Sequence, residues 1–278
     1  MIPIALEDTF ADVVSKAARG LLLTDKCIAD RSGTDPEKVA ALRAGHWDEA
    51  IARGIAPVLG LDTEGLVELA AGRSCPPPLK LANLEAFHTP YGDMIVNSYL
   101  AWDAISRSAV AFDTGADSSE LLDFLQQHDL KLVGLFLTHT HGDHIFDLDR
   151  ICERTHSPAF VNELEPLSGA ESFVAGRVWD YGWLRIESRL TRGHSRGGTT
   201  YFLAGLERPV AIVGDALFCG SMGGGMVSYV DAIKTNRAEI FTLPPQTLIC
   251  PGHGPLTTVE WESAHNPFFG PASRSGNQ

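Results

Sequence analysis

The sequence Thr138-His139-Thr140-His141-Gly142-Asp143-His144 places three imidazoles and a carboxylate within six residues, directly after the apolar run at residues 132–137. The apolar run predicts a buried strand. Side chains two residues apart on an extended segment point the same way, so His139 and His141 can hold one cation while Asp143 and His144 reach a second. This spacing arises by chance in a chain of this composition on the order of once in a thousand times, which disfavours a merely polar loop. The motif therefore predicts half of a two-metal site.

Composition limits the class of protein. The chain has 278 residues, of which 44% are hydrophobic, enough for one large domain or for a large and a small one. Its five cysteines lack C-x-x-C spacing and are odd in number, which is typical of reduced thiols rather than of a disulfide framework. The formal net charge of -13 disfavours nucleic acid as a partner.

The chain carries no predicted targeting or membrane segment. Residues 1–8 lack the basic start and apolar core of a signal peptide, and no apolar run is long enough to span a bilayer. We therefore expect a soluble, cytoplasmic protein with a small-molecule substrate and no membrane partner.

The first 73 residues predict a small all-helical domain. Thr34-Asp35-Pro36-Glu37 supplies a capping residue, an early proline and an acid, and Gly33 and Gly45 stand at predicted helix ends. Five short helices are expected, at residues 10–23, 24–32, 35–44, 48–59 and 63–71.

The order of the first three helices, with a turn at Gly33, resembles the helix-turn-helix module of phage repressors. Residues 1–75 carry 12 acids against 8 bases, however, which disfavours a DNA-reading surface. A packing role, or a homo-oligomer formed through this module, is preferred. A regulator that binds DNA and senses a ligand stays as the alternative outside enzymology.

A proline-rich linker is predicted at residues 74–79, because consecutive prolines exclude helix. A second domain follows at residues 80–278. Its expected helix is at residues 118–127, and its expected strands are at residues 80–87, 94–102, 109–112, 132–137, 159–161, 183–190, 199–203, 210–213 and 247–249.

Four segments of this second domain resemble the metallo-β-lactamase fold hydrolases in order and spacing, over about residues 80–270. That resemblance implies an α/β fold, an αββα sandwich with metals between the edges of two sheets and each ligand on a loop that leaves a strand. The segments are Thr138-His139-Thr140-His141-Gly142-Asp143-His144, Gly193-His194-Ser195, Gly214-Asp215 and Pro251-Gly252-His253-Gly254.

The resemblance also implies the ligands and the chemistry. Two divalent ions are expected, with zinc preferred. Iron and manganese stay open, since imidazole and carboxylate ligands suit all three metals. A metal-bound hydroxide would attack the substrate, and Asp143 or a metal-bound water would protonate the leaving group. The first ion would be held by His139, His141 and His194, the second by Asp143, His144 and His253, and Asp215 would bridge them, with Asp143 and Asp215 as the catalytic residues.

The carboxylate at Asp215 stands where the best-known zinc β-lactamases carry a cysteine, and it indicates the glyoxalase II-like or lactonase branches. Thioester or ester hydrolysis is thus the preferred reaction. After Asp215 the only bases are Lys234, Arg237 and Arg274, fewer than a glutathione-binding extension would supply.

Two other activities of this fold stay open, and several further residues are expected to lie outside the site. His139, His194 and Asp215 alone would form the mononuclear iron site of a persulfide dioxygenase of this fold. Tyr229 could serve a lactonase as an oxyanion donor, although a core role is preferred. Cys219 is expected to be a buried thiol, and His46, His88, His128, His156 and His265 are expected to be ordinary surface or hydrogen-bonded residues.

Overall fold

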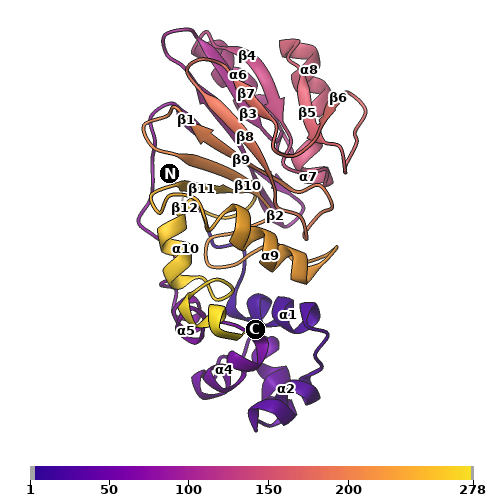
Figure 1. Ribbon diagram of the computed structural model, residues 1–278, viewed down its shortest axis with the longest axis vertical. Helices are drawn as coiled ribbons and strands as arrows, with labels where there is room; N and C mark the ends of the chain where they lie inside the picture. The colour runs from indigo at the N-terminus through magenta and orange to yellow at the C-terminus, as the bar shows by residue number, and fades with distance from the viewer. Residues whose placement is uncertain (1–3, 277–278) are drawn as a thin grey trace.

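A computed structural model describes residues 4–276 (Figure 1). Residues 1–3 and 277–278 and the side chain of Arg274 lie outside the described part. No helix within that part is both long and apolar enough to cross a lipid bilayer.

The N-terminal region is entirely helical, as predicted. Thr9, Thr24, Asp35, Asp48 and Asp62 each cap a helix by accepting a hydrogen bond from a backbone N–H of its first turn. The expected helix at residues 48–59 is in fact two, because Pro57 starts a separate 3-10 turn. The helices are α1 (Phe10–Gly20), α2 (Asp25–Ser32), α3 (Pro36–Arg43), α4 (Glu49–Ile55), η1 (Pro57–Leu59) and α5 (Thr63–Ala70).

Residues 71–83 contain neither helix nor strand and lead into two mixed six-stranded sheets. The first sheet runs, in spatial order, β1 (Leu84–Tyr91), β2 (Met94–Trp102), β3 (Ser108–Phe112), β4 (Lys131–Phe136), β5 (Ala159–Asn162) and β6 (Ala170–Phe173). The second runs β12 (Thr257–Thr258), β11 (Leu248–Pro251), β10 (Val210–Gly214), β9 (Thr199–Ala204), β8 (Arg185–Leu190) and β7 (Val178–Asp180).

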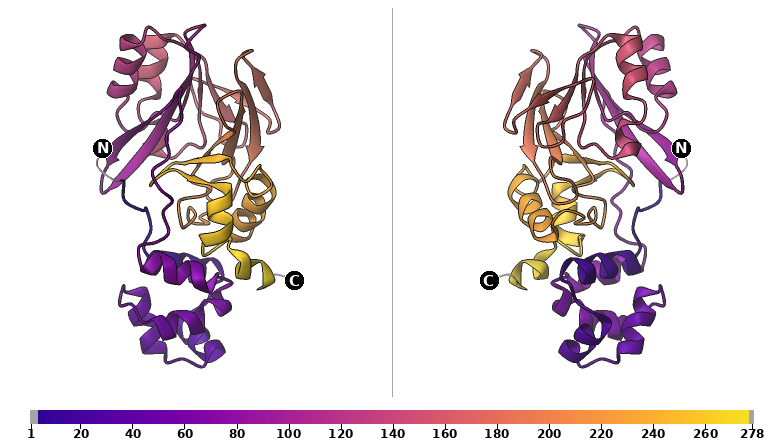
Figure 2. Two further views of the ribbon diagram at one scale, coloured as in Figure 1. Left: turned by 90° about the vertical axis from the view of Figure 1, so that its left-hand side faces the viewer. Right: turned by 90° about the vertical axis from the view of Figure 1, so that its right-hand side faces the viewer.

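The sheets pack face to face, with helices on their outer faces (Figure 2). Phe112, Phe136 and Tyr201 are buried between the sheets. The helices α6 (Ser119–Gln127) and α8 (Leu148–Thr155) cover the first sheet, and α9 (Tyr229–Glu239) and α10 (Val259–His265) lie with the second sheet. The predicted αββα sandwich behind a helical region is confirmed.

Some elements differ from the prediction. The strand expected at residues 80–87 begins at Leu84 and continues to Tyr91, because Asn83 adopts a left-handed turn with φ of 61°. The helix α9 was not predicted, since the exposed Val230 and the buried, polar Asn236 obscure the helical spacing of its core-facing residues. The short elements β6, β7, β12, α8 and α10 were missed as well.

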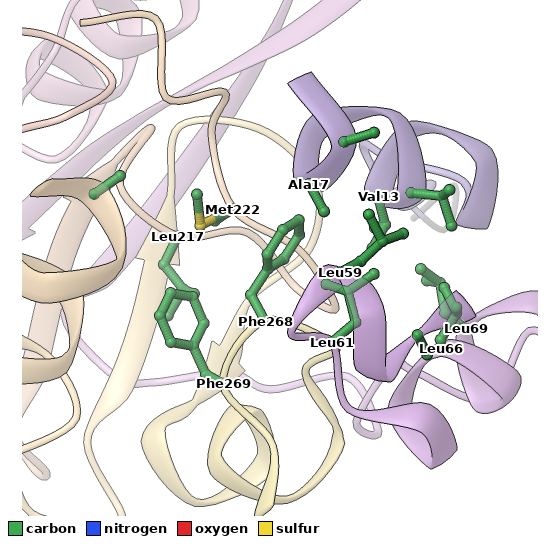
Figure 3. Packing of buried hydrophobic residues seen from close by; sticks show 14 of the residues in the cluster. Val13, Ala17, Leu59, Leu61, Leu66, Leu69, Leu217, Met222, Phe268 and Phe269 are labelled. Carbon is green, nitrogen blue, oxygen red and sulfur yellow. The ribbon is translucent and has the colours of Figure 1, made fainter. Parts of the chain in front are cut away.

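The helical region and the sandwich share one hydrophobic core (Figure 3). Val13 and Leu59 of the helical region belong to the same buried cluster as Met222, Phe268 and Phe269. The backbone N–H of Asp62 also donates to the carbonyl of Pro267 at 2.6 Å. The division into domains at residues 1–73, 74–79 and 80–278 stays a prediction, and so does the helix-turn-helix resemblance.

Candidate metal centre

All seven predicted ligand side chains come together where strands end. The motif at residues 138–144 follows β4 and leads into the short helix α7 (Gly142–Ile145), His194 lies between β8 and β9, Asp215 follows β10, and His253 follows β11. Two groups result, and within each group the ligand atoms lie within 4.8 Å of one another. The first group is His139, His141, His194 and Asp215, and the second is Asp143, His144 and His253.

The first group converges through three imidazole nitrogens. His141 Nδ1 lies 3.0 Å from His139 Nε2 and 2.9 Å from His194 Nε2. His194 Nε2 is also 3.3 Å from Asp215 Oδ2. Nitrogens that face one another this closely can share a single cation, because each keeps a lone pair when neutral.

The second group surrounds the Asp143 carboxylate. Asp143 Oδ2 lies 3.4 Å from His144 Nε2 and 3.3 Å from His253 Nε2. Asp215 reaches this group as well, with Oδ1 3.3 Å from His144 Nε2 and Oδ2 3.6 Å from His253 Nε2. Asp215 therefore contacts histidines of both groups, which is what a bridging ligand requires.

The donor set fits metal ions on a structural criterion. His144 Nε2 and Asp215 Oδ1 are buried, and neither has a hydrogen-bond partner within the described residues. A buried polar atom without a partner is costly unless something else satisfies it. A cation between these atoms would satisfy both.

The charge balance of the site points the same way. Burial alone would lower the pKa of His144, but the carboxylates of Asp215 and Asp113 outweigh burial and raise this pKa to about 10. Burial opposes ionisation of Asp215, yet His144 and His253 hold its pKa well below the ordinary value. The ionised carboxylates are therefore stabilised by nearby positive charge, which protonated histidines supply when no metal ion is bound.

Burial also lowers the pKa of His139 and of His194. Both rings are therefore neutral near pH 7, the form that binds a metal. Asp143 has a lowered pKa because its contacts with His253 and His144 outweigh its burial, so it is ionised under the same conditions.

A second layer of residues orients the ligands, and sequence reasoning missed it. Asp113 Oδ2 accepts from His144 Nδ1 at 2.8 Å and from Thr138 Oγ1 at 2.8 Å, and Asp113 Oδ1 accepts from the Thr138 N–H. The signal was available, since Asp113 is a carboxylate at the end of the apolar strand β3. Contacts of this kind set which ring nitrogen faces the metal.

Backbone carbonyls hold two further ligands. His194 Nδ1 lies 3.0 Å from the Gly224 carbonyl, and His253 Nδ1 lies 2.8 Å from the Ile95 carbonyl. Glu7, from the segment before α1, approaches His253 Nδ1 at 4.0 Å. No side-chain pattern could have indicated the two carbonyls.

Asn97 holds the loop that carries His253. Its side-chain amide donates to the carbonyls of Pro251 and Gly254, and its backbone N–H donates to the Gly252 carbonyl. Gly252 is required there, because an added Cβ would lie 2.2 Å from Asp215 Oδ1. The loop therefore approaches the aspartate more closely than any side chain permits.

The other singled-out residues lie outside the two groups. Tyr229 packs in the core beside Phe268, and its burial raises its pKa to about 12. Cys219 is a buried thiol. Within the described residues, His46, His88, His128, His156 and His265 belong to neither group, and His265 pairs with Glu68 at 2.6 Å.

Comparison with known proteins agrees with this geometry. A family model described as the metallo-beta-lactamase superfamily matches residues 91–253 and leaves the helical region outside the match. A probable metallo-hydrolase of Streptococcus pyogenes serotype M6 is 31% identical over 191 residues, 59% of this chain and 82% of that protein. A hydroxyacylglutathione hydrolase of Halorhodospira halophila is 29% identical over 174 residues, 60% of this chain and 64% of that protein.

A solved structure shows the same similarity. The BLEG-1 B3 metallo-beta-lactamase is 28% identical, with a TM-score of 0.58 over 66% of this chain and 99% of that chain.

Proposed function

The chain belongs to the metallo-beta-lactamase superfamily, and from that premise we propose that this metal-dependent hydrolase cleaves a thioester or a related ester of a small molecule. The observation that carries the proposal is the placement of Asp215, whose Oδ1 lies 3.3 Å from His144 and whose Oδ2 lies 3.3 Å from His194. One carboxylate in contact with both groups favours two cations that act together.

The ligand assignment follows from the two groups. We propose His139, His141 and His194 for one divalent ion, and Asp143, His144 and His253 for the other, with Asp215 shared. The imidazole and carboxylate donors suit zinc, which we prefer, and also iron or manganese. When bound, such ions make water nucleophilic near neutral pH and polarise a carbonyl.

The chain's own residues would handle the proton. Asp143 is ionised near pH 7 because of its histidine neighbours, so its carboxylate can accept a proton as attack proceeds. The same carboxylate, now protonated, can return that proton to the leaving thiolate or alkoxide. Asp113 keeps His144 oriented throughout, since the hydrogen bond at Nδ1 fixes the ring.

The surroundings of the ligands suggest an apolar acyl group in the substrate. Three exposed apolar side chains stand close in sequence to the ligands or to the residues that support them. Ile95 holds His253 through its own carbonyl. Phe146 follows His144, and Met226 follows Gly224, whose carbonyl holds His194. Apolar groups left in water gain by contact with an apolar ligand.

A glutathione moiety has less support. Of the few bases after Asp215, Arg237 donates to the Ser273 carbonyl, so it is engaged with the C-terminal segment. The matched part of the hydroxyacylglutathione hydrolase also covers only 64% of that protein. A thioester with an apolar acyl group and a smaller thiol is therefore preferred.

A mononuclear iron persulfide dioxygenase is the second candidate. The first group alone contains histidines and a carboxylate in contact, with His194 Nε2 3.3 Å from Asp215 Oδ2. Two histidines and one carboxylate suit ferrous iron and oxygen chemistry.

One set of measurements separates the candidates. Protein purified without added metal is assayed for metal content, for hydrolysis of S-lactoylglutathione and of acyl thioesters of increasing chain length, and for oxygen uptake on glutathione persulfide. We expect close to two ions per chain and thioester hydrolysis without oxygen uptake. A single iron with oxygen consumption would overturn the hydrolase proposal in favour of the dioxygenase.

A further inference from the structure

Two cysteines that are far apart in the sequence are in contact, one of them in the loop that follows Asp215. Cys75 Sγ, in the segment after α5, lies 3.5 Å from Cys219 Sγ, in the loop that follows Asp215. The two residues are 144 positions apart, so their spacing could not have indicated the pair. This contact has no part in the proposed hydrolysis.

The two thiols differ in access. Cys75 is exposed, whereas Cys219 is buried and lies 3.3 Å from the carbonyl of Ser74. The contact with the Cys219 sulfur lowers the pKa of Cys75. Cys75 is thus the thiol that a soluble reagent meets first and the one that ionises more easily.

Cys219 also begins the loop that supports the metal ligands. Gly220 donates its N–H to buried Glu262 at 3.0 Å, and the carbonyl of Gly224 holds His194. An added Cβ at Gly223 would lie 1.9 Å from the Asp215 carbonyl oxygen. Any covalent bond at Cys219 therefore anchors a loop in close contact with two ligands.

The segment around Cys75 is held against this loop and against α10. The Trp261 side chain of α10 donates from Nε1 to the Ser74 carbonyl at 3.0 Å. An added Cβ at Gly220 would lie 3.1 Å from Ser74 Cβ, which shows how tightly the two segments pack. The thiols are consequently kept near one another by surrounding contacts rather than by chance approach.

We propose that Cys75 and Cys219 are a modification site at which a low-molecular-weight disulfide, such as oxidised glutathione, introduces a reversible disulfide bond. The Cys75 thiolate attacks one sulfur of the reagent, forms a mixed disulfide and releases one glutathione thiol. Cys219 then attacks the Cys75 sulfur, its proton passes to the leaving glutathione sulfur, and the second glutathione is released as a thiol. Two protein thiols are oxidised and one reagent disulfide is reduced, so electrons and atoms balance.

The bond would form with little movement. A disulfide needs its sulfurs about 2.0 Å apart, so the observed pair must close by about 1.5 Å. The exposed Cys75 lies in a segment without helix or strand, which can supply this shift. Closure would tie the segment after the helical region to the loop that holds the ligands.

The test uses the full chain in a Cys27→Ser background, because Cys27 is exposed and would take up glutathione by itself. The folded protein is treated with oxidised glutathione, then denatured for thiol titration and intact-mass measurement. Of the four remaining cysteines, we expect two thiols to be lost with no retained glutathionyl group. We also expect the apparent Tm to rise by about 5 °C, since the crosslink restricts the unfolded chain.

Two variants make the outcome decisive. Cys219→Ser should stop at the first step and retain one glutathionyl group on Cys75, whereas Cys75→Ser should take up none at Cys219. Cys152→Ser, which removes a thiol remote from the pair in sequence, should behave like the parent. The proposal is overturned if the parent keeps a glutathionyl adduct on Cys75, links to a second chain, or retains all four thiols. Mass and thiol count do not depend on substrate, so this result is independent of the proposed hydrolase activity.

Discussion

The Nδ1 atom of His144 lies 2.8 Å from Oδ2 of Asp113, and both side chains are buried. This contact turns the opposite nitrogen, Nε2, toward Asp143 and Asp215. Asp113 also accepts hydrogen bonds from the backbone N–H and the hydroxyl of Thr138, the first residue of the histidine motif. A residue outside the motif thus sets the orientation of the ligands within it.

Replacing Asp113 should weaken metal binding without removing a ligand. We expect Asp113→Ala to lower metal affinity by about 10- to 100-fold, the usual effect of losing a partner that orients a ligand. Competition with a chelator measures the affinity. Asp117→Ala, an exposed aspartate nearby in sequence, is the control and should leave the affinity unchanged. Equal affinities in the parent and Asp113→Ala would contradict the positioning role.

Asp215 should be indispensable, because its carboxylate contacts histidines of both groups. Asp215→Ala is expected to abolish turnover and to reduce the metal content. His265→Ala, which removes the partner of Glu68 and the ring that stacks on Trp261, should keep the full metal content. Metal analysis and thioester hydrolysis measure both variants, and retained activity in Asp215→Ala would refute the site.

A single methyl group at position 252 should disrupt the second group. In Gly252→Ala the added Cβ would lie 2.2 Å from Asp215 Oδ1 and 2.7 Å from His144 Cε1, so Asp215 or the loop must shift. We expect at least a 10-fold loss of hydrolytic rate, comparable to the loss of a supporting contact at a metal site. Gly54→Ala in α4 meets nothing closer than 3.9 Å and should leave the rate unchanged.

The buried carboxyl of Glu262 should make stability depend on pH. Burial raises its pKa to about 7, although Thr257, Asn266 and Gly220 donate hydrogen bonds to it. The folded state therefore binds more protons than the unfolded state between pH 4.5 and about 7, and the free energy of unfolding falls as pH rises through that range. The loss should be a few kcal/mol at most, on the order of 1.4 kcal/mol for each unit of pKa shift.

Urea titrations of the parent and of Glu262→Gln across pH 5 to 8 isolate this contribution. The parent should lose stability with rising pH relative to the variant. Parallel profiles would show that Glu262 does not titrate in this range.

Truncation of Phe268 should affect the helical region and the sandwich together. Phe268 lies in the cluster that joins them (Figure 3). Phe268→Ala should lower the free energy of unfolding by about 3 to 5 kcal/mol, through lost burial and a residual cavity. Circular dichroism and tryptophan fluorescence should report one shared transition. Ile105→Ala, at a position 93% exposed, should change stability by less than about 0.5 kcal/mol.

The sequence predicted those features that depend on neighbouring residues. The histidine motif, the capped helices of the N-terminal region and the strand at residues 94–102 are local patterns of side-chain type and period. The positions of His194, Asp215 and His253 required family resemblance, because only the fold brings them to the motif. Their coordination of metal is still a prediction.

The features that were missed depend on contacts across the chain. The carbonyls of Ile95 and Gly224 hold ligands through backbone atoms that every residue possesses. The pairing of Cys75 with Cys219 depends on how the segment after α5 packs against a distant loop. The helical pattern of α9 is obscured because the polar Asn236 is buried and the apolar Val230 is exposed. In each case the information lies in tertiary packing rather than in local pattern.

The division of ligands between the two sheets has a consequence for the order of folding. His139, His141, Asp143 and His144 follow a strand of the first sheet, whereas His194, Asp215 and His253 belong to loops of the second. Neither sheet alone assembles either group, so high-affinity capture of metal must come late, after long chain loops have closed. Refolding should therefore be about as fast without metal as with it. Bound metal should slow unfolding far more than it speeds folding.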